Sequence, residues 1–252
     1  RTYQIKYILK LIFYKYETFL RLLSIILLHS PMIVSISQPT LFSWIGYYNI
    51  IKNSEVFVFL DNVKFKKQCW QNRNKLKSCV PGNNTSFWIN IPVKSPNSDI
   101  LIKDIYIDNE IDWKTEHKKT FLNNYGKQYE EIKFLQKIYE KDWEKLADFN
   151  IEFITECCKF LKIDTKLLKS SDMNCNGKKG DLVLDICKKF DTTEYLSAVA
   201  SKDYLEDCRP KFDENNIRIV YHDYVDPVYN QKGETFLEKL SILDLLFNEK
   251  NN

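Results

Sequence analysis

The 252-residue sequence is poor in glycine, with six in the whole chain. It contains no G-x-G-x-x-G fingerprint and no Walker lysine motif, so the usual glycine-cradled nucleotide sites are excluded. It also lacks the G-x-S-x-G and H-E-x-x-H motifs of hydrolases and zinc proteases. Any phosphate is therefore expected to be held by side chains and by the backbone amides at the start of a helix beginning near Leu41.

Metal-ligand patterns are also missing. The seven cysteines are an odd number with no C-x-x-C pair, and none of the three histidines lies at zinc-ligand spacing. This pattern predicts a reduced, cytoplasmic, metal-free protein. Cys69, between Lys67 and Arg73, could have a lowered pKa and act as a nucleophile, but a structural thiol is favoured because no histidine base lies near it in the sequence.

Charge of one sign and long apolar runs are lacking as well. The net charge is only +3, which is too small to argue for nucleic acid or an anionic membrane as a partner from charge alone, and neither is expected. The longest apolar run, Leu22 to Leu28, is far shorter than the roughly 18 residues of a membrane span. Residues 1–31 match no signal peptide, and we interpret them as an upstream, non-native segment that precedes a functional start at Met32.

What the sequence does contain is a β–α–β pattern directly after Met32. Ile33 to Ser37 and Val56 to Leu60 have the composition of strands, and Leu41 to Lys52 of a helix with Thr40 as its N-cap. Such a unit has parallel strands whose carboxyl ends share one edge, where open α/β folds bind ligands. Ser37, Gln38 and Asp61 are therefore expected to face one crevice.

The remaining pattern predicts one α/β domain over residues 32–248, with a Rossmann-like βαβ unit, a mostly parallel sheet and a helical insertion at about 112–190. Further strands are expected at Phe87–Val93, Ile100–Ile107, Tyr195–Leu196 and Ile217–Tyr221. Helices are expected at 112–124, 127–140, 142–162, Asp181–Phe190, Lys202–Asp207 and Leu237–Phe247.

The segment from Asp61 to Lys77 holds six basic residues and one acid. Arg73 suits bidentate contacts with phosphate or carboxylate, and Lys67 suits a point-charge contact. The side-chain amides in the segment can recognise sugar or base, and Trp70 offers a stacking face. Because the Gln-Asn-Arg-Asn run shows no periodicity of a helix or strand, a binding role is favoured over a solvated loop with Trp70 in the core. A platform for single-stranded nucleic acid is disfavoured because no wider basic surface accompanies it.

Three other places carry polar residues of interest. His117 lies on a helical face with Trp113 and Phe121, where a packing role is favoured over acid–base chemistry, and His222 is equally ambiguous. Lys202 and Tyr229 lie in polar clusters that follow the two late strands. Together with Asp61 they predict several loops that converge at one side of the sheet.

These residues, taken in order, resemble the WbqC-like family of bacterial proteins associated with O-antigen and other surface-polysaccharide gene clusters. The resemblance rests on Ser37-Gln-Pro, Trp44-Ile-Gly-Tyr, Asp61, Trp70-Gln-Asn-Arg-Asn, Tyr195-Leu-Ser, Lys202-Asp-Tyr-Leu, Tyr229-Asn-Gln and Ser241-Ile-Leu-Asp-Leu. It implies a site made of Gln38, Pro39, Asp61, Lys67, Asn72, Arg73, Asn74, His117, Lys202, Asp203, Tyr229 and Gln231. The chain departs from the family pattern at Ser37, where histidine is usual, and at Ala198 and Ser201, where glycine is usual.

The resemblance implies work on an activated sugar in the cytosol. By fold-level likeness to nucleotidyltransferases and amide-forming ligases, we expect acyl or aminoacyl transfer to the amine of a nucleotide-linked sugar. Lys67 and Arg73 would hold phosphates, Asp61 would orient or deprotonate the amine, and His117 would assist proton transfer. ATP or another activated acyl donor would supply the group. The alternatives are a non-catalytic sugar-nucleotide-binding or assembly protein and a transferase with another acceptor.

Overall fold

The computed structural model describes residues 31–79, 85–94 and 99–249. The described residues from Ile33 onward form one compact unit. The interpretation of residues 1–31 as an upstream segment falls outside the described residues, apart from Pro31, and stays a prediction. None of the helices in the described ranges is long and apolar enough to cross a membrane.

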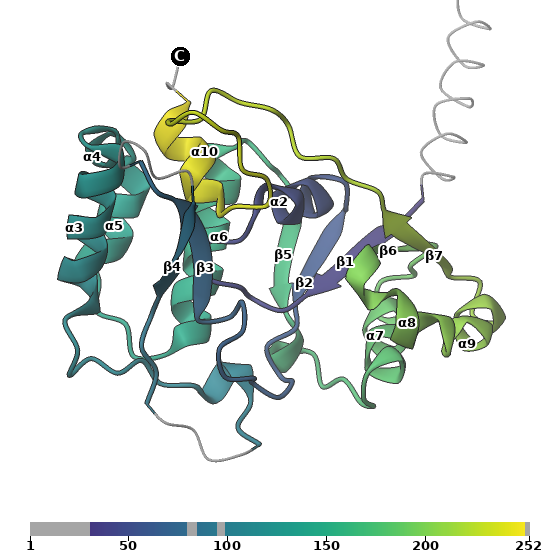
Figure 1. Ribbon diagram of the computed structural model, residues 1–252. Coiled ribbons are helices and arrows are strands. Elements are labelled where there is room, and N and C mark those ends of the chain that lie inside the picture. The colour runs from purple at the N-terminus through teal and green to yellow at the C-terminus, as the bar shows by residue number, and fades with distance from the viewer. Residues whose placement is uncertain (1–30, 80–84, 95–98, 250–252) are drawn as a thin grey trace, which may run out of the picture. The chain divides into compact units, whose positions relative to one another are not determined.

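The centre of the fold is a five-stranded parallel sheet with strand order β5-β2-β1-β6-β7 (Figure 1). Its strands are β1 (Ile33–Ser37), β2 (Val56–Phe59), β5 (Lys166–Lys169), β6 (Glu194–Ala198) and β7 (Arg218–His222). The predicted α/β class and the parallel βαβ unit are therefore confirmed. β5, which the sequence pattern did not indicate, forms one edge of the sheet, and β7 forms the other.

The central strands are buried because their composition suits burial on both faces. All four residues of β2, Val-Phe-Val-Phe, are buried, as is typical of a parallel strand covered on both sides. The crossover helix α2 (Ile45–Lys52) returns the chain so that Ser37 pairs with Phe59. This register brings the two carboxyl ends of β1 and β2 to the same edge.

The crossover helix begins later than predicted. Trp44, rather than Thr40, is its N-cap residue, because the chain first makes a turn in which Phe42 adopts a positive φ of 45°. The hydroxyls of Thr40 and Ser43 lie 2.6 Å apart within this turn. The Thr40 capping prediction is therefore wrong.

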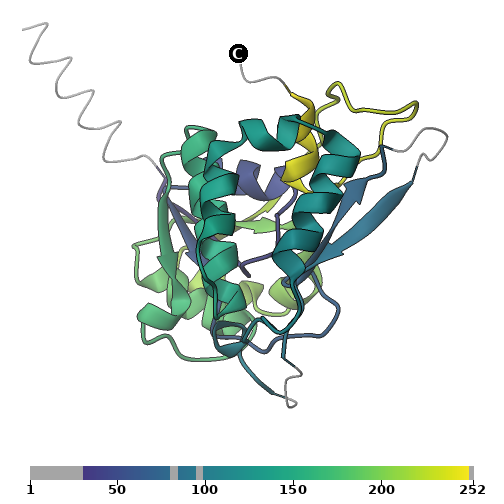
Figure 2. The same ribbon diagram turned by 90° about the vertical axis from the view of Figure 1, so that its left-hand side faces the viewer.

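A block of four helices lies between β4 and β5 in the chain. Its members are α3 (Trp113–Tyr125), α4 (Gln128–Glu131), α5 (Lys133–Glu140) and α6 (Leu146–Phe160). Figure 2, which faces this block, shows its helices side by side. The carboxylate of Asp112 caps α3 by accepting from the Thr115 amide, and Gly126, at φ 67°, ends it. The single helix predicted over 127–140 is interrupted at Ile132, whose ψ of 81° is not helical.

The other helices are α7 (Gly180–Lys188), α8 (Lys202–Glu206), α9 (Arg209–Glu214) and α10 (Ile242–Asn248). Figure 1 shows α7, α8 and α9 beside β6 and β7. The short 3-10 helices are η1 (Ile102–Asp104), η2 (Ser170–Asp172) and η3 (Val199–Ser201). The predicted strand over Ile100–Ile107 is wrong, since η1 occupies its middle and only isolated bridges flank it.

A separate antiparallel ribbon consists of β3 (Arg73–Lys77) and β4 (Ser86–Asn90). β4 confirms the strand predicted after Phe87, although it ends earlier. β3 was not predicted, because its Arg-Asn-Lys-Leu-Lys sequence has one apolar residue and therefore no alternation of apolar and polar side chains. The ribbon packs its Asn74, Leu76 and Ile89 inward.

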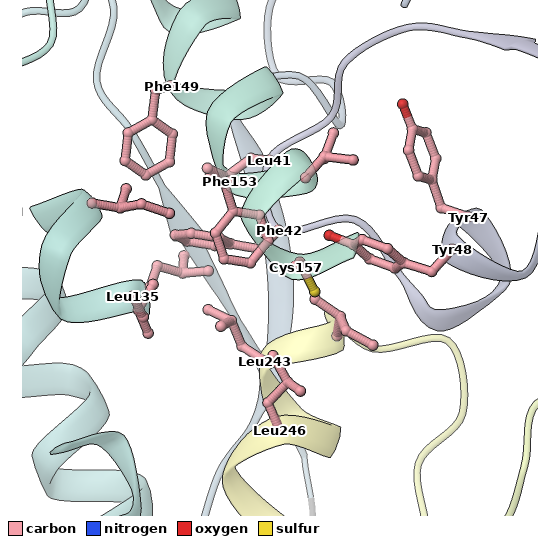
Figure 3. Close-up of a cluster of buried hydrophobic side chains, with 14 of the residues drawn as sticks. Leu41, Phe42, Tyr47, Tyr48, Leu135, Phe149, Phe153, Cys157, Leu243 and Leu246 are labelled. Carbon is pink, nitrogen blue, oxygen red and sulfur yellow. The ribbon is translucent and has the colours of Figure 1, made fainter. Parts of the chain in front are cut away.

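The main hydrophobic core joins the helical block to the sheet (Figure 3). Phe42 lies at its centre, with its ring centroid 4.9 Å from that of Phe153 and 5.9 Å from that of Phe149. Leu243 and Leu246 of α10 complete the cluster. The tight turn that contains Phe42 is therefore fixed on one side by aromatic packing.

Candidate functional site

The carboxyl edge of the parallel sheet has a topological switch point between β1 and β6. From β1 the chain proceeds outward to β2 and β5, and it then crosses to β6 and β7 on the other side. Open α/β sheets bind ligands in the crevice at such a point. The loops after β1 and β6, which carry Ser37-Gln38 and Lys202-Asp203, follow the two strands that meet at this switch point, so the expected crevice would lie between them.

The end of β1 is tied to the predicted binding segment. Gln71 donates from its side-chain amide to the side-chain oxygen of Gln38, and the thiol of Cys69 donates to Gln71. Tyr47 donates to the Gln38 carbonyl over 3.0 Å. The structure therefore brings the 61–77 segment and the β1 loop together.

Asp61 is only 2% exposed and its carboxylate is held by the loop after β5. Its Oδ1 accepts from the Ser171 amide at 2.9 Å and lies 3.0 Å from the Ser170 hydroxyl, and its Oδ2 accepts from the Ser171 hydroxyl at 2.7 Å. These bonds join the ends of β2 and β5. They favour a positioning role for Asp61 over direct contact with a substrate.

His117 lies in the helical block and is buried against Phe42, Trp113 and Phe121. Its Nε2 is 2.9 Å from the Asn90 carbonyl, which can only accept, so Nε2 carries the proton. Its Nδ1, 2.7 Å from the Tyr139 hydroxyl, must then accept. Burial lowers the pKa of His117 to about 4, which keeps the ring neutral. Both ring nitrogens of His117 form hydrogen bonds within the protein. These contacts favour a packing role for His117 over acid–base chemistry.

The Asn72-Arg73-Asn74 run splits between two surfaces because β3 alternates its side chains. Asn74 points inward and donates to the carbonyls of Leu41 and Phe42 at 2.8 and 3.0 Å. Arg73 points outward, with its Cζ 4.1 Å from the ring centroid of Trp88. The Asn72 amide reaches only the Ile91 carbonyl, at 3.4 Å. Only Arg73 and Asn74 of the Gln-Asn-Arg-Asn run lie in β3, and Gln71 and Asn72 precede the strand.

Lys67 and Lys202 are exposed at two different places. Lys67 lies in the loop before Trp70. Lys202 begins α8, with its ammonium 5.9 Å from the Tyr221 ring. Asp203 beside it is also exposed, so both side chains of this loop are available to a ligand.

Next to Lys202, Glu206 forms a two-pronged contact with Arg209, with both nitrogen–oxygen distances at 2.7 Å. Hydrogen bonds from Arg209 and Tyr221 lower the pKa of Glu206 to about 2. The negative charge of Glu206 is thereby paired with Arg209, and the nearby charge of Lys202 also favours the ionised form of Glu206.

Tyr229 and Gln231 are not brought to the crevice loops by any contact in the described structure. They bind the buried carboxylate of Asp244 on α10, at 2.6 and 2.7 Å. Tyr125 also donates to Asp244, and the fully buried Lys77 donates to the carbonyl of Thr235. The contacts favour a clamp that fixes the segment before α10.

Asn150 was missed by the sequence analysis and is central to the site. It is fully buried in α6 and donates to the carbonyls of Pro39 and Gln71 at 3.2 and 2.8 Å. It thus supports both the β1 loop and the binding segment from behind. The available signal was a polar residue on the apolar face of α6, between Phe149 and Phe153.

A groove of about 550 Å³ lies along β5, beside the loop that holds Asp61. Phe59, Leu167, Leu168 and Met173 give it an apolar lining. Lys189 adds positive charge, while Lys169 lies 3.8 Å from the carboxylate of Asp172, which also lines the groove. Its size is that of a small-molecule site. Within the described ranges no group of three His, Cys, Asp or Glu side chains could hold a metal ion.

Together, the parallel sheet and the polar loops that follow its strands define an α/β protein. The chain belongs to the WbqC-like protein family, whose sequence model matches residues 38–252. It is 30% identical over 221 residues to an uncharacterized protein of Mycobacterium tuberculosis, a match that covers 85% of this chain and 93% of that protein. No solved structure matches the chain.

Proposed function

We propose that this protein acts in the cytosol in surface-polysaccharide (O-antigen) biosynthesis, where it transfers an acyl or aminoacyl group to the amine of a nucleotide-linked sugar. The observation that carries the proposal is the contact between the β1 loop and the 61–77 segment beside the switch point of the sheet, where the neighbouring parallel strand β6 also ends. Membership of the WbqC-like family supports the pathway.

The crevice residues would bind the substrate. Ser37 and Gln38 would contact the sugar, because they end the central strand, and Lys202 and Asp203 would do so from the opposite loop. Lys67 and Arg73 would hold the phosphates. The groove beside β5 would accept the apolar part of an acyl donor, with Lys189 near its anionic group.

In the transfer, the amine nitrogen bonds to the acyl carbonyl carbon and the bond to the donor's leaving group breaks. A thioester or an ATP-derived acyl phosphate would be the donor. The departing thiolate or phosphate would take up the proton that the amine loses. Asp61 would act through the loop that it positions, since its oxygens already accept hydrogen bonds from Ser170 and Ser171.

One observation favours the alternative of a non-catalytic sugar-nucleotide-binding or assembly protein. Asp61 and His117, the acid–base candidates, are both buried and both hydrogen-bonded within the protein. A protein that only binds its ligand needs neither as a proton carrier.

Turnover separates the two functions. The protein would be incubated with nucleotide-linked amino sugars and either ATP with amino acids or acyl thioesters, and the sugar followed by mass spectrometry. A mass gain equal to the acyl group is expected. Calorimetric binding without product across the panel would overturn the transferase and leave the binding protein.

A variant pair tests the crevice itself. Lys202→Ala should weaken binding of the sugar nucleotide by about 1.5–3 kcal/mol, as for loss of a charge-assisted hydrogen bond. Lys119→Ala removes an equally exposed lysine from α3, where it pairs with Glu116, and should leave affinity unchanged. Equal affinities of the two variants would remove Lys202 from the site.

A further inference from the structure

The outer face of the β3–β4 ribbon carries two cations and an exposed indole. The register pairs Lys75 with Trp88 and Arg73 with Asn90, so Arg73, Lys75 and Trp88 share one face. Trp88 is 44% exposed. The opposite face packs into the core through Asn74 and Leu76.

Both cations stack on the Trp88 ring. The Cζ of Arg73 is 4.1 Å from the ring centroid, and the Nζ of Lys75 is 5.0 Å from it. Neither has a carboxylate partner among the residues described, and the buried Nε of Arg73 has no hydrogen-bond partner there. The indole therefore orders two positive charges that form no salt bridge with a carboxylate of the described residues.

Trp70 extends this surface toward the crevice. Its ring is 50% exposed and its centroid lies 5.5 Å from that of Trp88, at an interplanar angle of 44°. The Trp70 carbonyl accepts from the Leu41 amide at 2.8 Å, and the next residue, Gln71, contacts Gln38. The ring is thus anchored by its backbone beside the end of β1.

We propose that Trp70, Arg73, Lys75 and Trp88 form a platform that binds the nucleoside diphosphate part of the substrate. The base stacks on Trp70, and the phosphates lie against Arg73 and Lys75. This inference rests on the proposed function, which it deepens by assigning the nucleotide to the ribbon and the sugar to the crevice loops.

The geometry suits a nucleotide better than a sugar phosphate. In a nucleotide, the ribose separates the phosphates from the flat base, whereas in a sugar phosphate the phosphate is bonded directly to the ring. Here the cations lie over Trp88, one ring away from the more exposed Trp70. Stacking of a base on an aromatic side chain contributes a large part of the binding free energy of a nucleotide. It does so for every base, because each base has a flat face.

A single nucleotide is also favoured over a nucleic-acid strand. The two ordered cations of the ribbon suffice for one diphosphate. A strand needs a basic groove that follows its backbone, and the whole chain carries a net charge of only +3.

The experiment compares UDP and GDP with inorganic diphosphate, using calorimetry and quenching of tryptophan fluorescence. Trp70→Ala should weaken both nucleotides about tenfold, as expected for one lost stacked base, and change diphosphate binding less than about twofold. Arg73→Gln should weaken all three ligands about tenfold. Tyr106→Ala is the matched control, because Tyr106 is 48% exposed and forms a cation–π pair with Lys145 elsewhere.

Three results would overturn the platform: no binding of either nucleotide, equal effects of Trp70→Ala on nucleotide and diphosphate, or affinity for oligothymidylate that rises with its length. Nucleotide binding lost with Trp70 in a protein that makes no product would uphold the platform and reject the transferase. Product formation by Trp70→Ala with an unchanged KM for the nucleotide-linked sugar would reject the platform and uphold the transferase.

Discussion

The side-chain amide of Asn74 donates to the backbone carbonyl of Phe42, 3.0 Å away and 32 positions earlier in the chain. Phe42 has a positive φ, a conformation that costs a non-glycine residue about 1 kcal/mol or more. The bond, with its partner to the Leu41 carbonyl, fixes the turn between the β1 loop and α2. A residue matched to the family's site motif thus shapes the crevice from behind.

Replacement of Asn74 tests that relationship. Asn74→Ala should lower the free energy of unfolding by about 1–3 kcal/mol, because two buried carbonyls lose their donor. Urea unfolding measures it. Lys75→Ala, the outward-facing neighbour, should change the free energy by less than about 0.5 kcal/mol. Equal stability of the two variants would show that Asn74 does not hold the turn.

Protonation of His117 should make stability depend on pH. Its pKa is about 4 in the folded protein and 6.5 when unperturbed, so between these values the unfolded chain binds more protons. Stability should be greatest above pH 6.5 and fall by about 2 kcal/mol between pH 7 and pH 5. His117→Gln should flatten this dependence in denaturant titrations. His222→Gln should flatten it less, because His222 is only half-buried. An unchanged slope in His117→Gln would contradict the buried, neutral assignment.

The clamp on Asp61 predicts a structural effect of a small change nearby. Ser171→Ala removes the hydroxyl that donates to Asp61 Oδ2 and should lower the free energy of unfolding by about 1–3 kcal/mol. Thermal unfolding provides the measurement. Ser201→Ala, in η3, is the control. Full stability of Ser171→Ala would free Asp61 for a direct role with substrate.

Tyr229 distinguishes a clamp from a ligand site. Tyr229→Phe removes one donor to the buried Asp244 and should cost about 1.5–3 kcal/mol of stability, as for hydrogen bonds to charged groups. Nucleotide affinity, measured by calorimetry well below the unfolding temperature, should stay unchanged. Lower affinity with full stability would place Tyr229 in the ligand site instead.

The parallel core of the fold was predictable because its signals are local. The Ile-Val and Val-Phe runs of β1 and β2, and the helix between them, are legible from composition alone. β5 was not, because two leucines between lysines do not distinguish an edge strand from a loop. β3 was missed for a similar reason, since its polar Asn74 and Lys77 are buried by contacts with remote parts of the chain.

The positions of the candidate residues in the fold were more predictable than their contacts. Strand ends located Gln38, Asp61 and Lys202, because parallel topology fixes where they lie. The hydrogen bonds that occupy Asp61 come from residues 109 and 110 positions away, and those of Asn150 span 79 and 111 positions. Pairing over such separations depends on the packed fold and leaves no local pattern.

The two outer strands of the sheet, β5 and β7, are short and carry charge. β5 begins and ends with lysine, and β7 begins with Arg218. A charged edge strand of this kind is a poor template for pairing with another chain. A strand that paired with it would form backbone hydrogen bonds, but it would also remove water from ammonium or guanidinium groups, which costs free energy. The same charged edge lets the apolar residues of the β5 groove stay open to small molecules with little risk of fibril-like growth.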